Sequence, residues 1–398
     1  MENYAHDNVI LPDPTNLQRI VNRTRASKRP KHPTNLLFDL DMPNIPKHFL
    51  RGDILHGLGE REKRHLIFAT KKQLRLLRRM KRWYLDGTFR LVKKPMMQLW
   101  TIHGFLKVWN APKKRYELKQ VPLLYVLMSR RTAGDYKAVL KFIKDKIFKK
   151  KFALQEVVGD FEKAVWRAVQ DVFPGVTIKG CGFHWSQCLL RKIKNIGMTK
   201  LYREHEGVRS ICKQLMSLNL IPWQKVQLCW ENLVQQGKDL KLKRCDAEKL
   251  VKFLKYVKCY WIKNNTWPPS TWCVFMQSIR TNNDTEGWHT RLHKLAGLLN
   301  QSGMNLYSLI ELLHHDACSL DLNLKLLFQH RTLRRQRVGS RLVNSKIFDL
   351  WMTYNDSDNG FSTMDLLLKL SKVHCAKFSL KQNVDDQRVE PDDCNFDD

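Results

Sequence analysis

The chain has 398 residues, enough for two or three domains, and 43% of them are apolar, enough for a packed core. Lysine and arginine total 70 against 38 acidic residues, and the net charge of +32 indicates a polyanionic partner, most often nucleic acid. The sequence shows neither an apolar run of transmembrane length nor a signal-peptide pattern, which argues against a membrane span. Its ten cysteines include no Cys-x-x-Cys pair, which argues against a zinc ribbon and a disulfide framework.

Residues 1–35 form a polar, basic arm, and its four prolines between positions 12 and 33 predict no regular structure. The basic residues at 23–31 are compatible with phosphate contacts or a nuclear-import signal, and equally with a solvated linker. Scattered cysteines indicate a reducing compartment, and the charge favours a nucleic-acid partner. We therefore expect the protein in the nucleus.

Residues 36–82 predict a helical N-terminal region. Within it, 61–82 combines apolar positions at helical spacing with many cations, which is the pattern of an amphipathic helix with a basic face. That face either contacts a DNA backbone or is simply solvated, and the pattern fits both. The cations concerned are Lys71, Lys72, Arg75, Arg78, Arg79 and Arg82.

Residues 83–199 predict the first part of an α/β core. Aromatic and β-branched runs predict strands at 83–92, 97–105, 121–129, 153–159 and 177–181, and helical spacing predicts helices at 133–151 and 161–172. This order of elements is that of a ribonuclease H-like core, a mixed sheet flanked by helices. The first and fourth strands of that fold are neighbours, so Asp86 and Asp160 would lie together at one edge of the sheet.

The rest of the chain predicts helices. Residues 200–275 predict an all-helical insertion, and 276–345 predict the last part of the core, with helices at 286–299 and 306–327. Residues 346–398 predict a C-terminal helix and an acidic tail. Two further basic segments are expected to make salt-sensitive phosphate contacts, namely 141–151 and 329–341 with Arg331, Arg334, Arg335 and Arg337.

Three carboxylates follow or begin predicted elements. Asp86 and Asp160 each end an apolar strand beside a glycine, and Glu286 lies near the start of a helix. Taken singly, such residues are usually turn or helix-capping residues. Three of them on separate elements of a very basic chain predict a site for a hard divalent cation, which prefers oxygen ligands and leaves room for substrate phosphates.

Cys181 and His184 follow the last predicted strand of the core. They have the spacing of half a zinc site, but no second pair at ligand spacing accompanies them. His184 is expected either to hydrogen-bond a phosphate or to be structural. Trp185 and Trp272 would be able to stack on an unpaired base, although tryptophan is more often a core residue.

Five motifs in order resemble the transposase domain of Mutator-like elements, over residues 35–345. They are Asp-Gly-Thr-Phe at 86–89, Gln-Leu-Trp-Thr-Ile-His-Gly at 98–104, Gly-Asp-Phe-Glu at 159–162, Cys-Gly-Phe-His-Trp-Ser-Gln at 181–187 and Asn-Asn-Asp-Thr-Glu-Gly-Trp-His at 282–289. The resemblance implies a DDE/D transposase with a ribonuclease H-like core and a helical insertion. The catalytic carboxylates of the family would fall on Asp86, Asp160 and Glu286, and its Cys-x-x-His on Cys181 and His184.

The resemblance also implies the cofactor and the partners. Two Mg²⁺ or Mn²⁺ ions would be bridged by Asp86, with Asp160 and Glu286 holding one each. The partners would be transposon ends and target DNA, and a homodimer on DNA is expected because two ends must be paired. The zinc modules that often flank the domain in relatives have no counterpart here. A captured transposase that only binds DNA or regulates transcription, and a nuclease without strand transfer, are therefore the alternatives.

Overall fold

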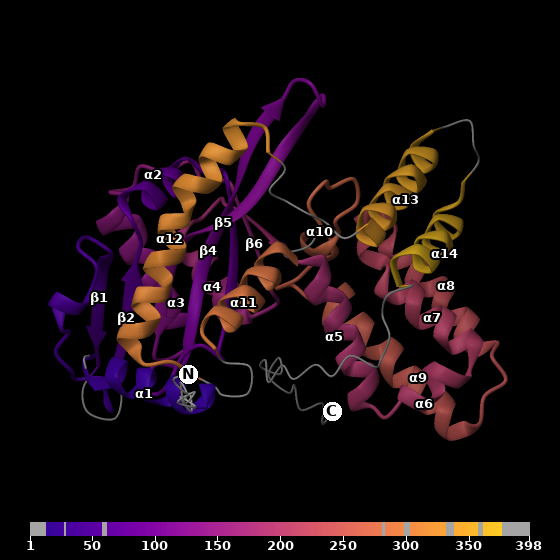
Figure 1. Cartoon of the computed structure of the whole chain (residues 1–398). Coiled ribbons are helices and arrows are strands. Elements are labelled where there is room, and N and C mark those ends of the chain that lie inside the picture. Colours follow the sequence, from indigo (N-terminus) through magenta and orange to yellow (C-terminus); the bar gives the residue numbers. More distant parts are fainter. Residues whose placement is uncertain are drawn as a thin grey trace, which may run out of the picture.

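The computed structural model describes residues 13–27, 29–57, 62–280, 283–297, 303–331, 338–356 and 361–375. A seven-stranded mixed sheet with helices on its faces forms one half of the molecule (Figure 1). Its strands run in the spatial order β1-β2-β5-β4-β3-β6-β7. They are β1 (Leu50–His56), β2 (Lys63–Phe68), β3 (Arg82–Thr88), β4 (Gln98–Asn110), β5 (Arg115–Met128), β6 (Glu156–Gly159) and β7 (Thr177–Gly180).

The order of strands and helices predicted for 83–199 is confirmed. β3, β4 and β5 form an antiparallel meander, and β6 and β7 then add in parallel on the other side of β3. The helices between them are α3 (Ala133–Phe142), continued by a π-helical turn at Ile143–Ile147, and α4 (Lys163–Val172). The predicted neighbours, the first and fourth strands of this region, are therefore β3 and β6.

The sheet is covered on both faces, and β5 shows how. Leu124 and Val126 belong to the core cluster that includes side chains of α3 and α4. Tyr125 and Leu127, on the opposite face, belong to a second cluster with α11 (Asn283–Leu295) and α12 (Leu306–Phe328). Successive side chains of a strand point to opposite faces, so a continuous apolar run suits a strand buried on both sides.

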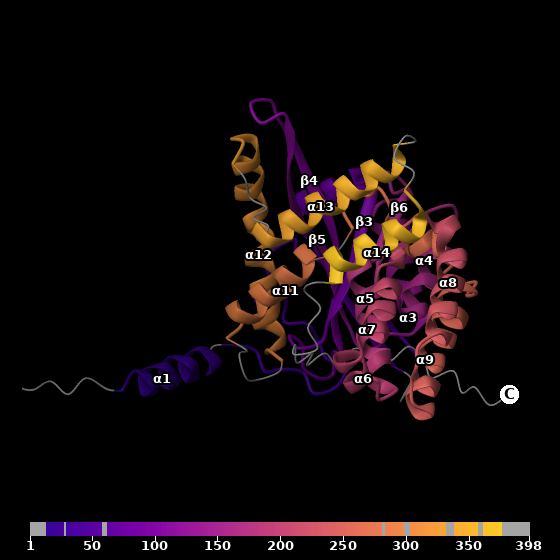
Figure 2. The same cartoon turned by 90° about the vertical axis from the view of Figure 1, so that its right-hand side faces the viewer.

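Two predictions for the N-terminal region are wrong. Residues 36–82 do not form a helical region, because β1 and β2 form an antiparallel hairpin there. The helical part of its described residues is α2 (Lys71–Arg79) and a short 3₁₀ helix at Met42–Asn44. The apolar residues of β2 pair with β5 and are fully buried, and this pairing overrides the helical spacing. The arm contains a helix, α1 (Pro14–Ser27), which extends away from the rest of the protein in Figure 2. Proline at the first helical position is compatible with a helix.

The other half of the molecule is helical, as predicted for 200–275. It contains α5 (Gly182–Asn195), α6 (Thr199–Glu204), α7 (Glu206–Met216), α8 (Val226–Lys238), α9 (Arg244–Val257) and α10 (Pro269–Trp272), and α13 (Val338–Asn355) and α14 (Thr363–His374) pack on it. Trp351 of α13 donates a hydrogen bond of 2.7 Å to the carbonyl of Leu220. No described helix is long and apolar enough to cross a membrane.

Candidate metal centre

Asp86 lies in β3, with the parallel strand β6 beside it, and is 2% exposed. Its Oδ1 accepts a hydrogen bond of 2.9 Å from the backbone N–H of Gly87. Its carbonyl accepts one of 3.2 Å from the hydroxyl of Thr101 on β4. The sheet therefore fixes both the backbone and the carboxylate of Asp86.

His184 comes from the first turn of α5, which begins directly after β7 with Cys181 as its N-cap residue. Both side chains are buried, with exposures of 5% for His184 and 1% for Cys181. Burial alone lowers the pKa of His184, but Cys181, Glu286 and Asp86 outweigh it and hold this pKa well above its usual value. The charged imidazolium is thus favoured in a site that contains two carboxylates.

Glu286 lies in the first turn of α11, and its Oε1 is 3.5 Å from Nε2 of His184. The segments next to these two residues are also joined, because the N–H of Gly182 donates to the carbonyl of Arg280 at 3.1 Å. Figure 1 shows the resulting arrangement, with α11 between the sheet and α5. The start of α11 is therefore held against the start of α5.

Asp316 of α12 fastens α11 to the sheet. Its buried carboxylate accepts hydrogen bonds from Nε1 of Trp288 at 2.8 Å and from the hydroxyl of Tyr125 at 3.0 Å, and it forms an ion pair with Arg291. Trp288 and Arg291 belong to α11, and Tyr125 belongs to β5. This network places Glu286 on a helix that is tied to the central strands.

Asp86, His184 and Glu286 form a group that could hold a metal ion. One ligand atom from each lies within 4.8 Å of the other two, and the three residues come from segments far apart in the sequence. Two carboxylates offer the oxygen ligands that hard divalent cations prefer, and an imidazole is a further nitrogen ligand for softer ones. The side chain of Glu286 is 28% exposed, so the group is open to solvent on that side.

Asp160 does not join this group among the described residues. The register that pairs Tyr84 with Val158 places Asp160 level with Asp86 when it is continued by two residues. The charge of Asp160 acts instead on Glu162, whose pKa rises to about 8 through burial and this neighbouring carboxylate. The predicted nearness of the two aspartates thus holds for the backbone register, while the side chain of Asp160 lies outside the group.

Two histidines at the site were not assigned to it from the sequence. Nδ1 of His289 is 3.8 Å from Oδ2 of Asp86. His103 of β4 contacts the hydroxyl of Thr101 at 2.9 Å, and burial and the charge of His289 hold its pKa well below the usual value. The position of His289, three residues after Glu286 and so on the same helix face, is the signal that could have identified it.

The cations predicted to bind DNA fall into three groups. Lys71, Arg75, Arg78 and Arg79 are exposed on α2, and Arg331 is exposed after α12. Lys72 forms an ion pair with Asp321, and Arg82 forms one with Glu156 on the adjacent strand. Arg334, Arg335 and Arg337 lie outside the described residues.

The proposed base-stacking role of Trp185 or Trp272 is wrong for this structure. Both side chains are fully buried, and they stack on each other with ring centroids 4.0 Å apart. Neither has a face available to a nucleotide, so both serve the helical core.

Comparison with known proteins adds no family to this description. No protein-family model matches the chain, and no curated protein matches it.

Proposed function

We propose that this chain is a DNA transposase of the Mutator-like type, with a ribonuclease H-like core that cleaves DNA and transfers strands with the help of divalent metal ions. The observation that carries the proposal is the convergence of Asp86, His184 and Glu286, from three distant segments, on one point beside β3. All three lie in motifs that resemble those of the Mutator-like family.

The sheet supports the ribonuclease H-like part of the proposal. An antiparallel meander followed by two parallel strands with helical crossovers is the arrangement expected of that core. β1 and β2 extend the sheet on the meander side, away from Asp86. The helices from α6 to α10 lie between the segment that carries His184 and the one that carries Glu286, where a helical insertion is expected.

The chemistry has two phosphoryl transfers. In the first, water attacks a phosphodiester at the element end, the bond from phosphorus to the 3′-oxygen breaks, and a 3′-hydroxyl is released. In the second, this hydroxyl attacks a target phosphodiester, and the 3′-oxygen of the target strand leaves. Bound Mg²⁺ or Mn²⁺ ions would lower the pKa of the attacking oxygen and stabilise charge on the leaving oxygen.

The residues have separate parts in this chemistry. Asp86 and Glu286 would hold metal through oxygen ligands. Asp160, which directly follows β6 and is level with Asp86 when the register is continued, would supply the third carboxylate. His184, next to Glu286, positions that carboxylate and donates a hydrogen bond to the phosphate being cut.

The charge distribution supports a DNA substrate. The exposed cations of α2 and the net charge of +32 supply the sequence-independent attraction to phosphates. A homodimer on DNA follows from the need to pair two ends, and nuclear localisation follows from the substrate.

Relaxation of supercoiled plasmid tests catalysis without knowledge of the element ends. Nicking is expected with Mn²⁺ or Mg²⁺, and we expect Asp86→Asn and Glu286→Gln to abolish it while leaving plasmid binding intact. Asp160→Asn should abolish it as well. Glu248→Gln, which removes a carboxylate exposed on α9, is the matched control and should nick like the parent.

The same assay separates the proposal from its alternatives. Unchanged nicking by Asp86→Asn would refute the assigned site. Tight binding without nicking by the parent in either metal would instead favour a captured transposase that only binds DNA. Nicking without joining of a 3′-hydroxyl oligonucleotide to the plasmid would favour a nuclease without strand transfer.

A further inference from the structure

A second group of metal-ligating side chains lies at the β1–β2 hairpin, where β1 forms one edge of the sheet. His56 is the last residue of β1, His65 is in β2, and Asp135 is in the first turn of α3. The hairpin pairs Ile54 with His65 and His56 with Lys63, so the two histidines are diagonal neighbours on one face. Two strands, β5 and β4, lie between β2 and β3, the strand that carries Asp86.

The geometry of this group is that of a ligand set. One ligand atom from each of His56, His65 and Asp135 lies within 4.8 Å of the other two. Nε2 of His65 is 3.3 Å from Oδ1 of Asp135, and both residues are 0% exposed. Two ligand atoms of a tetrahedral zinc ion are about 3.3 Å apart, since each lies about 2.0–2.1 Å from the metal.

The polar side-chain atoms of His56, His65 and Asp135 that face one another are poorly paired by hydrogen bonds. Nε2 of His56 is buried and has no hydrogen-bond partner among the described residues, whereas Nε2 of His65 and Oδ1 of Asp135 have only each other and Lys63, at 3.3 and 3.4 Å. Burying polar groups with poor hydrogen bonds is costly, so an arrangement that gathers one such atom from each of three residues favours a shared partner. A metal ion that accepts imidazole and carboxylate ligands would satisfy three residues together.

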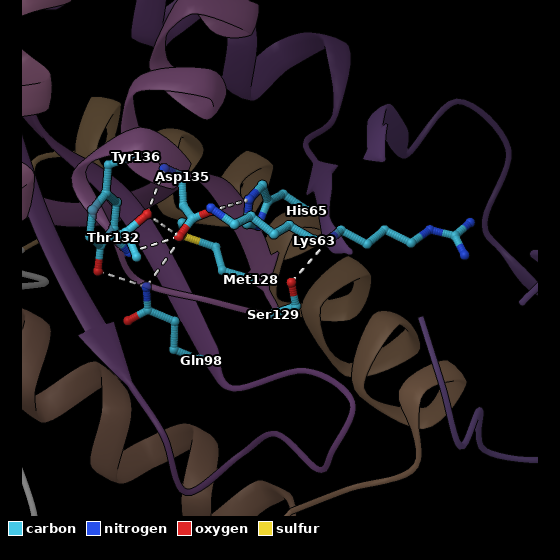
Figure 3. Close-up of polar contacts among 9 residues, drawn as sticks. Lys63, His65, Gln98, Met128, Ser129, Thr132, Asp135 and Tyr136 are labelled. Carbon is cyan, nitrogen blue, oxygen red and sulfur yellow. Dashed lines mark hydrogen bonds and ion pairs between the residues drawn. The ribbon is translucent and has the colours of Figure 1, made fainter. Parts of the chain in front are cut away.

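Hydrogen bonds at the N-terminal cap of α3 fix the orientation of the Asp135 carboxylate. Oδ2 of Asp135 accepts hydrogen bonds of 2.7 Å from both the N–H and the hydroxyl of Thr132, which forms a capping box at the start of α3. Figure 3 shows this bonded side of Asp135 toward Thr132, with His65 and Lys63 on the other side. Second contacts of this kind fix the orientation of metal-ligating carboxylates.

Lys63 occupies the place of a cation in this structure. Its Nζ is 3.4 Å from Oδ1 of Asp135, and its side chain is 23% exposed. The ammonium group offsets the charge of the buried carboxylate, and a flexible, partly exposed side chain can swing into solvent when another cation takes its place. Lys63 should therefore compete with a metal ion for Asp135.

We propose that His56, His65 and Asp135 bind a divalent transition-metal ion, with Zn²⁺ as the first candidate. Two imidazoles and one carboxylate match its ligand preferences, and a water molecule would complete the tetrahedron. The ion would link both strands of the hairpin to the start of α3. Its role would be structural, and it would be independent of the ions proposed for Asp86 and Glu286.

Calorimetric titration of the full chain with zinc chloride, after removal of bound metal by a chelator, tests the site. The titration uses an Asp86→Asn/Glu286→Gln background, so that the first group cannot contribute. We expect one equivalent of Zn²⁺ to bind, and His56→Gln or His65→Gln to weaken binding by more than about 100-fold, since loss of a mere supporting contact already costs 10–100-fold. His315→Gln, at an exposed histidine of α12, is the control and should bind as the background does.

Lys63→Met keeps the assignment testable if a histidine variant folds poorly, because it should change affinity in the opposite direction. Removing the competing ammonium should tighten Zn²⁺ binding, and the visible spectrum of bound Co²⁺ should become that of a tetrahedral ion with nitrogen and oxygen ligands. Affinity that is unchanged in both histidine variants, or a background protein that binds no Zn²⁺, would overturn the proposal. Weaker binding by Lys63→Met would also overturn it, since it would mean that the lysine supports the site.

Discussion

Replacement of Asp316 by asparagine tests whether the buried carboxylate of α12 positions the helix that carries Glu286. The change keeps the shape of the side chain but removes its charge and one acceptor oxygen. Tyr125 and Trp288 both donate to Oδ2, at 3.0 and 2.8 Å, and the side chain of Asp316 is 2% exposed. In the variant, the amide NH2 group replaces either Oδ2, so that both donors lose their acceptor, or Oδ1, so that it faces the guanidinium group of Arg291.

The magnitude follows from these contacts. A hydrogen bond to a charged group contributes about 1.5–3 kcal/mol, and an unsatisfied buried donor costs about 1–3 kcal/mol. The ion pair with Arg291 adds little, because the arginine side chain is 49% exposed and surface pairs are worth about 0–1 kcal/mol. We therefore expect the free energy of unfolding to fall by about 2–4 kcal/mol, which is a large part of the stability of an ordinary domain.

Urea unfolding followed by tryptophan fluorescence measures this loss, and Mn²⁺ titration measures its effect on the metal centre. Asp321→Asn, on the same helix but 58% exposed in its ion pair with Lys72, is the matched control and should cost less than about 1 kcal/mol. Tyr125→Phe combined with Asp316→Asn should be less than additive, because the two share one bond. A loss below about 1 kcal/mol for Asp316→Asn, or full additivity, would refute the reasoning.

Three further predictions concern packing, pH and salt. Gly52→Ala should lower the free energy of unfolding by about 1–3 kcal/mol, because its Cβ would lie 2.5 Å from a ring carbon of Phe142; an unchanged urea midpoint would contradict this. Burial and the charge of Arg280 lower the pKa of His374 to about 3, so below pH 6.5 the unfolded chain takes up a proton that the folded chain does not. Stability should therefore be full above pH 6.5 and fall by about 2 kcal/mol by pH 5, and unfolding curves of His374→Gln should lack this part of the fall. Arg75→Ala on α2 should reduce the slope of log affinity for duplex DNA against log salt by about 0.9, whereas an unchanged slope would place α2 outside the DNA interface.

The central sheet could be predicted from the sequence because its strands carry their own signals. Residues 83–92 and 121–129 are rich in apolar, aromatic and β-branched residues over a strand's length, and Lys93-Lys94-Pro95 ends the first of them. The crossover helix from 133 shows helical spacing, and its capping threonine marks its start. These local signals were sufficient for the order of elements. The expected pairing of β3 with β6 came from the likeness of that order to a ribonuclease H-like core.

The β1–β2 hairpin could not be predicted in the same way. Residues 63–68 mix cations with apolar side chains, a pattern that suits either a helix or a strand. Pairing with β5 decides between them, and that partner lies far along the chain. The sequence of β5 predicts a strand from local signals alone. No local signal, however, indicates that a further strand, β2, pairs with its edge.

In the candidate metal centre, too, local sequence signals do not determine which side chains come together. Its backbone positions follow from topology: two parallel strands put Asp86 and Asp160 level with each other, and a helix start brings Glu286 near them. Which side chains point to the common centre depends on contacts outside the motifs. His184 reaches the centre because β7 leads directly into α5, and Glu286 reaches it because Asp316 holds α11 against the sheet. Asp160 instead lies in the electrostatic environment of Glu162 and does not join the group among the described residues.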